Sequence, residues 1–302
     1  MLEPPRFPDF KPLELADRPR VQPALWAFQP VTSELTFTNL YMWRRHYGIR
    51  WCLADGWLLL LYAAHPGGAC LLEPIGPPGR AALARRALGW LAGPGGSPDA
   101  RLERAGAALA DELAAAGGFA LEPTREHFDY VYSAPALIAL AGKKLHAKRN
   151  HLARFRREHS ARFLPLVPEL VPACLAVAER WCALRGCAED VDLDSEWQAV
   201  RDLLEHAQAL EVRGGALEVD GRVEAFGLGE LLNARTAVIH VEKADPGVPG
   251  MYAAIHQQHL EHVWAGVELV NREQDLGEEN LRKAKESYQP LRLEPKHRVR
   301  LS

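Results

Sequence analysis

The stretch from Thr236 to Pro290, TAVIHVEKADPGVPGMYAAIHQQHLEHVWAGVELVNREQDLGEENLRKAKESYQP, is the most informative part of the sequence. Its pattern predicts a strand, a Gly/Pro loop, a helix, a second strand and a charged helical turn. Polar residues alternate at the ends of both predicted strands: His240 and Glu242 on the first, and Asn271, Glu273 and Asp275 on the second. Successive strand residues point to opposite faces, so each set is expected to share a face. If the strands are neighbours, these side chains converge at one end of a sheet.

The composition is that of a globular protein without a strong overall charge. Of the 302 residues, 48% are hydrophobic and 25% are charged, and the formal net charge is -3. This length allows two ordinary domains. Because the net charge is close to zero, attraction to nucleic acid or to a membrane would have to come from a local patch.

The N-terminus and the cysteines predict a cytoplasmic protein. The start MLEPPRFPDFKP has Pro and charge where a secretory signal needs an apolar core, and the longest apolar run, residues 57–64, is too short to span a membrane. The cysteines are odd in number and form no C-x-x-C pair, which predicts reduced, buried thiols. They are Cys52, Cys70, Cys174, Cys182 and Cys187.

Two parts of the chain repeat the same order of elements. Asp55-Gly56 and Asp220-Gly221 each predict a tight hairpin turn, and each is followed by a strand, a Gly/Pro loop and a helix. This repetition predicts two similar α/β units. We place them at residues 1–130 and 131–302, with the active site in the second. Helical periodicity further predicts helices over residues 36–47, 80–91, 102–116, 165–186 and 195–212.

The order hairpin, strand, Gly-containing loop, helix and strand resembles the acyltransferase fold of the GNAT type. Three stretches are also similar to the signature stretches of a bacterial family related to the C-terminal domain of phosphatidylglycerol lysyltransferases. They are DYVYSAPALIALAGKKLHAKRNHLARF, HVEKADPGVPGMYAAIHQQ and NREQDLGEENLRKAKESYQP. The likeness covers nearly the whole chain. It implies an α/β fold of two tandem GNAT-like units, with mixed sheets flanked by helices.

The resemblance also implies a transferase. The lysyltransferases pass an aminoacyl group from a charged tRNA to a lipid head group, so aminoacyl-tRNA is the expected donor and no permanently bound cofactor is expected. The sequence has no counterpart of their multi-span membrane portion. The acceptor therefore stays open between a lipid head group, a peptide and a small molecule.

A basic stretch between Lys143 and Arg162 is a candidate phosphate-binding surface. Counterion release favours such a patch on the phosphates of tRNA or of coenzyme A. The alternative is a solvated helix face with Leu145, Leu152 and Phe155 turned inward, but repulsion between like charges on one helix favours a phosphate partner. The predicted phosphate-binding residues are Lys143, Lys144, Lys148, Arg149 and Asn150.

The loop Ala244–Gly250 lies where GNAT enzymes hold the pyrophosphate of coenzyme A at a helix N-terminus. Gly247 and Gly250 would allow close approach of a phosphate. The two prolines of the loop remove N–H donors, however, and Asp245 adds negative charge. Acyl-CoA is therefore the second choice of donor.

The residues with catalytic potential cluster at the two strand ends. His240 or Glu242 could act as the base, and Glu273 and Asp275 could hold the donor's α-ammonium, with Asn271 on the same strand. His240 could equally be a satisfied, half-buried histidine, and Glu242 could pair locally with Lys243 or Arg272. Further substrate-binding candidates follow in the last helical turn: Arg282, Lys285 and Tyr288.

Two other patterns in the same stretch favour structural roles. Asp275 and Glu278 resemble a capping box at the start of the last helix, and Glu279 and Lys283 form a favourable i, i+4 pair. His256 and the histidine three residues later lack a third ligand of fitting spacing, so no metal site is predicted.

Three functions therefore compete. The first is a tandem GNAT-like transferase that uses aminoacyl-tRNA, the second an acyl-CoA-dependent N-acyltransferase, and the third a non-catalytic module that binds tRNA or another anion. The sequence does not indicate the oligomeric state.

Overall fold

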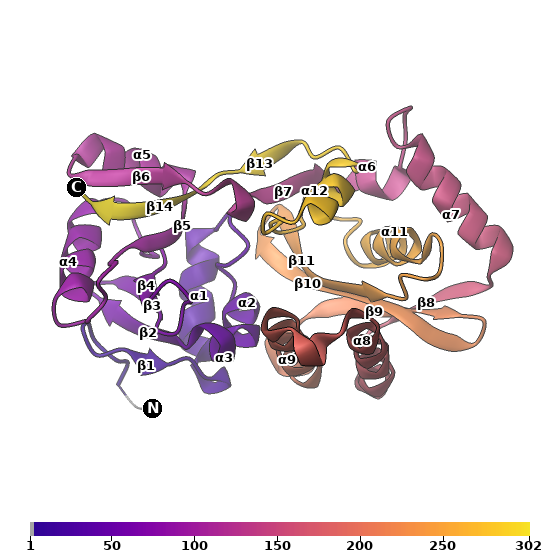
Figure 1. The fold of residues 1–302 in the computed structure, drawn as a ribbon, viewed down its shortest axis with the longest axis horizontal. Helices are drawn as coiled ribbons and strands as arrows, with labels where there is room; N and C mark the ends of the chain where they lie inside the picture. Colours follow the sequence, from indigo (N-terminus) through magenta and orange to yellow (C-terminus); the bar gives the residue numbers. More distant parts are fainter. Residues whose placement is uncertain (1–2) are drawn as a thin grey trace. The chain divides into compact units, whose positions relative to one another are not determined.

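Two seven-stranded mixed sheets form the framework of the computed structural model, which describes residues 3–302 (Figure 1). The chain packs into two compact units. The first contains the residues up to Asp129 together with 274–277 and 293–302, and the second contains 130–273 and 278–292. A sequential division at residue 130 did not include the two short C-terminal segments that return to the first unit.

The first sheet has the strand order β1-β2-β3-β4-β5-β14-β6. Its strands are β1 (Lys11–Pro12), β2 (Ile49–Ala54), β3 (Trp57–Tyr62), β4 (Cys70–Leu71), β5 (Leu102–Gly106), β6 (Phe119–Pro123) and β14 (Lys296–Leu301). The helices of this unit are α1 (Arg18–Phe28), α2 (Phe37–Met42), α3 (Arg44–Tyr47), α4 (Ala81–Ala92) and α5 (Ala107–Ala116). Asp55 and Gly56 both have positive φ and form the predicted hairpin turn between β2 and β3. Leu59 on β3, Leu88 on α4 and Leu109 on α5 meet in its apolar core.

The predicted helix over residues 102–116 is only partly correct. Residues 102–106 form β5, and the helix begins at Ala107. Leu102 and its neighbours favour a helix by propensity, but all five residues of β5 are buried between β4 and β14. Pairing on both sides outweighs the weak local preference.

The second sheet has the order β13-β7-β12-β11-β10-β9-β8. Its strands are β7 (Asp129–Ser133), β8 (Ala161–Pro165), β9 (Arg213–Val219), β10 (Arg222–Asn233), β11 (Thr236–Ala244), β12 (Leu269–Asn271) and β13 (Arg292–Glu294). The helices are α6 (Ala134–Ala139), α7 (His146–Glu158), α8 (Val171–Arg185), α9 (Val191–Glu205), α10 (Ala207–Leu210), α11 (Met251–Val263) and α12 (Glu279–Glu286). Helix α11 covers one face of the sheet, and α8 and α9 cover the other (Figure 1). The second predicted hairpin, at Asp220-Gly221, joins β9 to β10.

The two sheets match strand for strand, which confirms the predicted pair of similar units. Each has a parallel pair near its middle, β4 with β5 in the first sheet and β11 with β12 in the second. In each sheet, the strand beside the parallel pair breaks the order of the chain. Strand β7 follows β6 in the sequence but lies in the second sheet, and the C-terminal β14 takes the matching place in the first.

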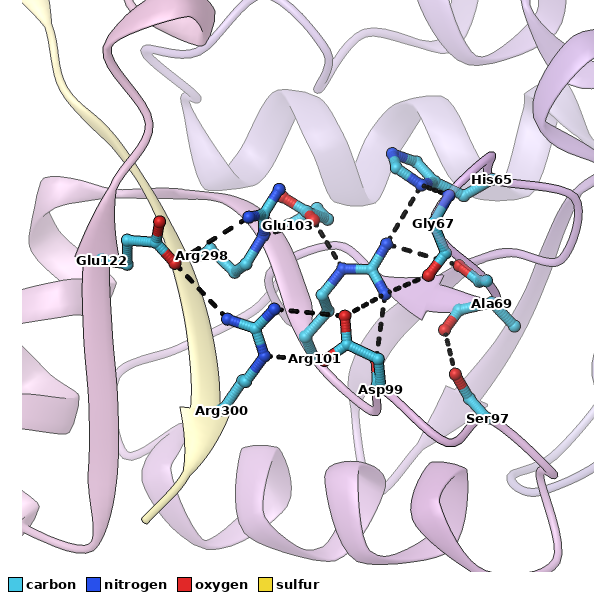
Figure 2. A network of polar contacts seen from close by, with 11 residues as sticks. His65, Gly67, Ala69, Ser97, Asp99, Arg101, Glu103, Glu122, Arg298 and Arg300 are labelled. Atoms are coloured by element: carbon cyan, nitrogen blue, oxygen red, sulfur yellow. Dashed lines mark hydrogen bonds and ion pairs between the residues drawn. The ribbon is translucent and has the colours of Figure 1, made fainter.

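Ion pairs hold β14 in the first sheet (Figure 2). Arg298 donates to Glu103 on β5 over 2.7 Å, and Arg300 pairs with Asp99 over 2.7 Å. Arg101 also donates to Glu103, over 2.6 Å, and its guanidinium reaches main-chain oxygens of the loop at Gly67. The network therefore links the last strand of the chain to β5 and to the loop between β3 and β4.

Lys296 begins β14 inside the first unit. Its side chain is fully buried, and Nζ lies 2.7 Å from Glu34 and 2.6 Å from Asp129. Ser33 donates its main-chain N–H to the same Asp129 carboxylate over 2.7 Å. A buried lysine of this kind is compensated by its two carboxylates.

The prediction of reduced cysteines is wrong for two of the five. Cys182 and Cys187 form a disulfide, because the turn at Gly186 brings the residue after α8 back onto its last turn. The other three are buried free thiols, and burial raises the pKa of Cys174 to about 12. Within residues 3–302, no helix has both the length and the apolar character needed to cross a membrane.

Candidate active site in the second unit

Strand β11 carries the first two candidate residues, and β12 is its parallel neighbour, which meets the condition for the two sets of polar residues to converge. Val238 pairs with Asn271, the last residue of β12. The second strand is shorter than predicted. The Asn271 side chain accepts the N–H of Glu273 over 2.8 Å, and Glu273 has a φ of 57°, which turns the chain out of the sheet.

A β-bulge lies at His240. The pairing of β10 with β11 passes from Leu228–Val241 to Gly229–Ile239, which leaves His240 as an extra residue. Bulges interrupt the two-residue alternation and redirect a side chain. The prediction that His240 and Glu242 share a face therefore does not follow from regular strand geometry, and the two residues have different partners.

His240 is held between two carboxylates. Its Nδ1 lies 2.9 Å from Glu273, and its Nε2 lies 2.9 Å from Glu230 on β10. Burial lowers the pKa of His240, but the hydrogen bonds to Glu230 and Glu273 outweigh it and raise the pKa to about 9. At neutral pH the ring is a cation that donates from both nitrogens. This geometry favours an ion-pairing role for His240 over a role as base.

Glu242 faces α11 and sits at the centre of a second polar cluster. Its Oε1 lies 2.7 Å from His256 Nδ1, and its Oε2 accepts from Arg272 over 3.0 Å. Burial raises the pKa of Glu242, but His256 and the Arg272 guanidinium outweigh it and lower the pKa to about 2. The carboxylate is therefore ionised at neutral pH. The predicted alternative of a pairing with Arg272 is confirmed, and the pairing with His256 is additional.

Sequence reasoning missed His256 as a site residue. The close approach of α11 to the sheet is made possible by Gly227, which pairs with Glu242; a Cβ there would lie only 2.5 Å from the ring of His259. His256 is 1% exposed, and its Nε2 has no hydrogen-bond partner among the described residues. Burial lowers its pKa below 6.5, and Arg272 lowers it further, whereas Glu242 raises it.

The ring of Tyr288 completes this cluster. Arg272 lies 5.0 Å from its centroid, the ring of His256 lies edge-on at 5.1 Å, and the Lys148 ammonium lies at 4.3 Å. Lys285 is buried, and its Nζ donates to the main-chain oxygen of Arg272 over 2.6 Å. Three of the ten predicted binding residues, Lys148, Lys285 and Tyr288, thus lie together with Glu242. Arg282 lies on α12, the helix that also carries Lys285.

The basic stretch forms α7, with Leu152 and Phe155 buried as expected. Lys143, Lys144 and Asn150 are exposed. Arg149 has a structural task, because its guanidinium donates to the main-chain oxygens of Leu140 and Gly142 at the end of α6. Helix α7 thus combines solvent-exposed cations with one lysine, Lys148, that is turned toward Tyr288.

The loop Ala244–Gly250 is closed by its own groups and by α7. The Asp245 carboxylate accepts the N–H of Gly247 over 2.7 Å. Gly250 caps α11, and a Cβ at this position would lie 2.7 Å from the main-chain oxygen of His151 on α7. Protein atoms therefore lie against Gly250 at the start of α11, where the sequence suggested a phosphate.

The predicted capping box at Asp275 does not form. Asp275 accepts the N–H of Gly277 over 2.9 Å and pairs with Arg125 over 3.1 Å, and Glu278 caps α12 without a side-chain hydrogen bond. Gly277 has a positive φ and forms a turn between Asp275 and Glu278, so Asp275 does not lie at the N-cap position of α12. The predicted pair of Glu279 and Lys283 is confirmed, with 2.6 Å between its charged atoms.

Over the described part of the chain, the histidine and acidic side chains that come close enough to share a metal ion are Asp202, Glu205 and His206. His256 and His259 do not belong to this group. His259 Nε2 instead accepts the indole N–H of Trp264 over 3.1 Å.

Comparison with known proteins agrees with this architecture. Residues 27–300 match the model of the family described as "Phosphatidylglycerol lysyltransferase, C-terminal". The chain belongs to this family. Among curated proteins, none matches the chain significantly.

Solved structures of similar proteins show the same fold. A conserved protein of unknown function from Bacteroides thetaiotaomicron is 30% identical, with a TM-score of 0.90 over 97% of this chain and 99% of that one. The C-terminal domain of a putative lysylphosphatidylglycerol synthetase from Agrobacterium fabrum is 16% identical, with a TM-score of 0.64 over 95% and 92% of the two chains. A tandem GNAT protein from the clavulanic acid biosynthesis pathway is 12% identical, with a TM-score of 0.54 over 97% and 98%. The predicted tandem GNAT-like fold is confirmed, and the family points to acyl or aminoacyl transfer in general.

Proposed function

We propose that the protein transfers an aminoacyl group from aminoacyl-tRNA to an amine or hydroxyl acceptor, and that the reaction takes place in the second unit. Membership of the lysyltransferase C-terminal family supports the reaction class. The basic surface of α7 supports an RNA donor, and the cluster around Glu242 supplies acid–base chemistry.

The observation that carries the proposal is the position of Lys148. This residue belongs to the basic helix α7, yet its ammonium lies 4.3 Å from the Tyr288 ring centroid, on the ring that His256 and Arg272 also contact. Burial lowers the pKa of Lys148, and the nearby Arg272 guanidinium lowers it further. One helix thus joins a surface suited to phosphates with the buried polar cluster.

The loop geometry supports tRNA over acyl-CoA as the donor. GNAT-type binding of coenzyme A needs open N–H groups at the start of a helix. At α11, the main-chain oxygen of His151 lies against Gly250, and the N–H of Gly247 already has an acceptor in Asp245. A phosphate chain would have to displace α7 to reach this helix end.

The acceptor is a lipid head group, a peptide or a small molecule that offers an amine or a hydroxyl. Each of these provides the X–H group that an aminoacyl ester requires as its attacking partner. The cations around Tyr288 do not distinguish between these three classes of acceptor.

Binding of tRNA to α7 and to the turn before it can be tested by charge removal. The triple variant K143A/K144A/R157A removes three exposed cations, two in that turn and one on the helix. We expect its affinity for charged tRNA to fall, and the slope of log K against log salt to become shallower by about 2 to 3, since each lost phosphate contact removes about one unit.

Arg162 on β8 provides a matched control, because it is exposed but paired with Glu218 over 3.1 Å. R162A should bind tRNA nearly as the unchanged protein does. Equal affinity and salt slope for the triple variant and the unchanged protein would contradict the role of α7. Calorimetry with acetyl-CoA tests the other donor, and binding at micromolar concentration would favour the acyl-CoA alternative.

A further inference from the structure

We propose that His256 is the general base of the transfer reaction, with Glu242 as the residue that positions its ring; this inference rests on the proposed function. Two observations support it: the Glu242 carboxylate contacts one ring nitrogen of His256, and the other ring nitrogen has no hydrogen-bond partner among the described residues. Both features follow from contacts between β11 and α11.

The Glu242 carboxylate fixes the tautomer of His256. An ionised carboxylate can only accept hydrogen bonds, so the 2.7 Å contact requires the proton to lie on His256 Nδ1. Arg272 holds the other carboxylate oxygen over 3.0 Å and prevents the group from turning away. The neutral ring therefore presents Nε2 as an acceptor.

The second ring nitrogen of His256, Nε2, makes no hydrogen bond to the described residues. Nε2 is buried and has no partner in residues 3–302, and a buried polar group left in this way costs about 1–3 kcal/mol. Arg272 Nη1 is likewise buried without a partner in the same described range. Both side chains contact the Tyr288 ring, so one cluster holds an acceptor atom and a donor atom that the described part of the fold leaves unused.

This pair of atoms matches the needs of aminoacyl transfer. His256 Nε2 takes the proton from the acceptor X–H while X attacks the ester carbonyl carbon, and a C–X bond forms. The Arg272 guanidinium can donate to the oxyanion that develops. As the C–O ester bond breaks, His256 returns the proton to the 3′ oxygen of the tRNA, which leaves as a hydroxyl and restores the neutral ring.

Several charged and titratable groups surround the His256 ring. Glu242 on β11 favours its protonation, whereas Arg272 after β12 and Lys148 on α7 oppose it. Tyr288 is neutral at physiological pH because burial raises its pKa. His259, one turn further along α11, is also neutral there, since burial lowers its pKa to about 4. The balance leaves His256 unprotonated at pH 7, as a base must be.

The Tyr288 ring packs on the buried His256 ring. The Tyr288 ring is 9% exposed and lies edge-on to His256, and it also packs against Lys148 and Arg272. Because Nε2 is buried, an acceptor group reaches it only after the surrounding side chains move. A donor that binds α7 would act on Lys148, which packs on this ring.

The tautomer of His256 can be read directly by NMR of the full chain labelled with [15N]histidine. The chain has 12 histidines, and comparison with H256Q identifies the signals of His256. We expect an Nδ1–H ring with unprotonated Nε2 at pH 7, and a pKa below that of an ordinary histidine. An Nε2–H tautomer or an imidazolium at pH 7 would overturn the assignment.

Kinetics provide the second test. The probes are lysyl- and alanyl-tRNA with three acceptors: phosphatidylglycerol vesicles, a lysine-containing peptide and glycerol. We expect H256Q to lower kcat by roughly 10²- to 10⁴-fold with unchanged affinity for tRNA. H262Q, which changes an exposed histidine of the same helix, should keep the original rate.

The variant E242Q tests the positioning role of Glu242. It removes the negative charge that raises the pKa of His256, so the acid limb of the rate profile should move to lower pH while kcat falls.

An unchanged protein that consumes none of the charged tRNAs would overturn the proposed function. One that consumes them while H256Q does so at the same rate would overturn only the assignment of His256.

Discussion

Glu242 and His240 are two residues apart on β11, yet their protonation has opposite consequences for stability. The pKa of Glu242 is lowered to about 2, so its stabilising effect is present above the ordinary glutamate range and is lost as the pH falls toward 2. The pKa of His240 is raised to about 9, so its stabilising effect is complete below 6.5 and is lost as the pH rises through 9.

These shifts predict a stability maximum bounded on both sides. Removing the carboxylate in E242Q leaves Arg272 without its buried partner and should lower the free energy of unfolding by about 3–5 kcal/mol at pH 7. The acid-induced loss between pH 4.5 and 2 should be smaller in E242Q than in the unchanged protein. Chemical denaturation at several pH values measures both.

H240Q should remove the alkaline part of the same profile. In the unchanged protein the free energy of unfolding should fall between pH 6.5 and 9, because the unfolded chain loses the histidine proton before the folded chain does. In H240Q this fall should be largely absent. An identical alkaline slope in both proteins would contradict the ion-paired state of His240.

At the scale of elements, β14 is the strand on which the first sheet depends. It lies between β5 and β6, and its first residue, Lys296, is buried against the carboxylates of Glu34 and Asp129. K296M removes the cation that lies 2.6 Å from the buried Asp129 carboxylate, while Glu34 keeps Arg104 at 3.3 Å. The loss should destabilise the protein by about 3–5 kcal/mol.

Arg300 gives the matched control on the same strand. Its guanidinium is partly exposed and pairs with Asp99, so R300A should cost less than about 1 kcal/mol. Hydrogen exchange should show that K296M opens the first sheet, from β5 to β6, ahead of the second. Equal effects of the two variants would contradict the central role of Lys296.

At the scale of the whole molecule, local patterns predicted the repeated architecture and missed what long-range pairing decides. Asp55-Gly56 and Asp220-Gly221 identify hairpins because both residues need positive φ, a requirement written in the sequence itself. The exchange of β7 and β14 has no such local signal. Residues 102–106 likewise became a strand only because β4 and β14 flank them.

The candidate site divides in the same way. Glu242 was identified from strand alternation, and Lys148 and Tyr288 from charge and family resemblance. His256 was missed because its partner is on the preceding strand, 14 residues away, and only the packing of α11 against Gly227 brings the two together. The disulfide between Cys182 and Cys187 depends in turn on the tight turn at Gly186.

The most direct test of the proposed function is acceptor-dependent deacylation of charged tRNA by the purified protein. Radiolabelled aminoacyl-tRNA is incubated with and without the acceptor panel, and the label is followed from tRNA to product. We expect transfer that requires both protein and acceptor and that H256Q lowers by at least 10²-fold. Charged tRNA that stays intact with every amino acid and acceptor, or label that moves equally well without the protein, would contradict the proposed aminoacyl transfer.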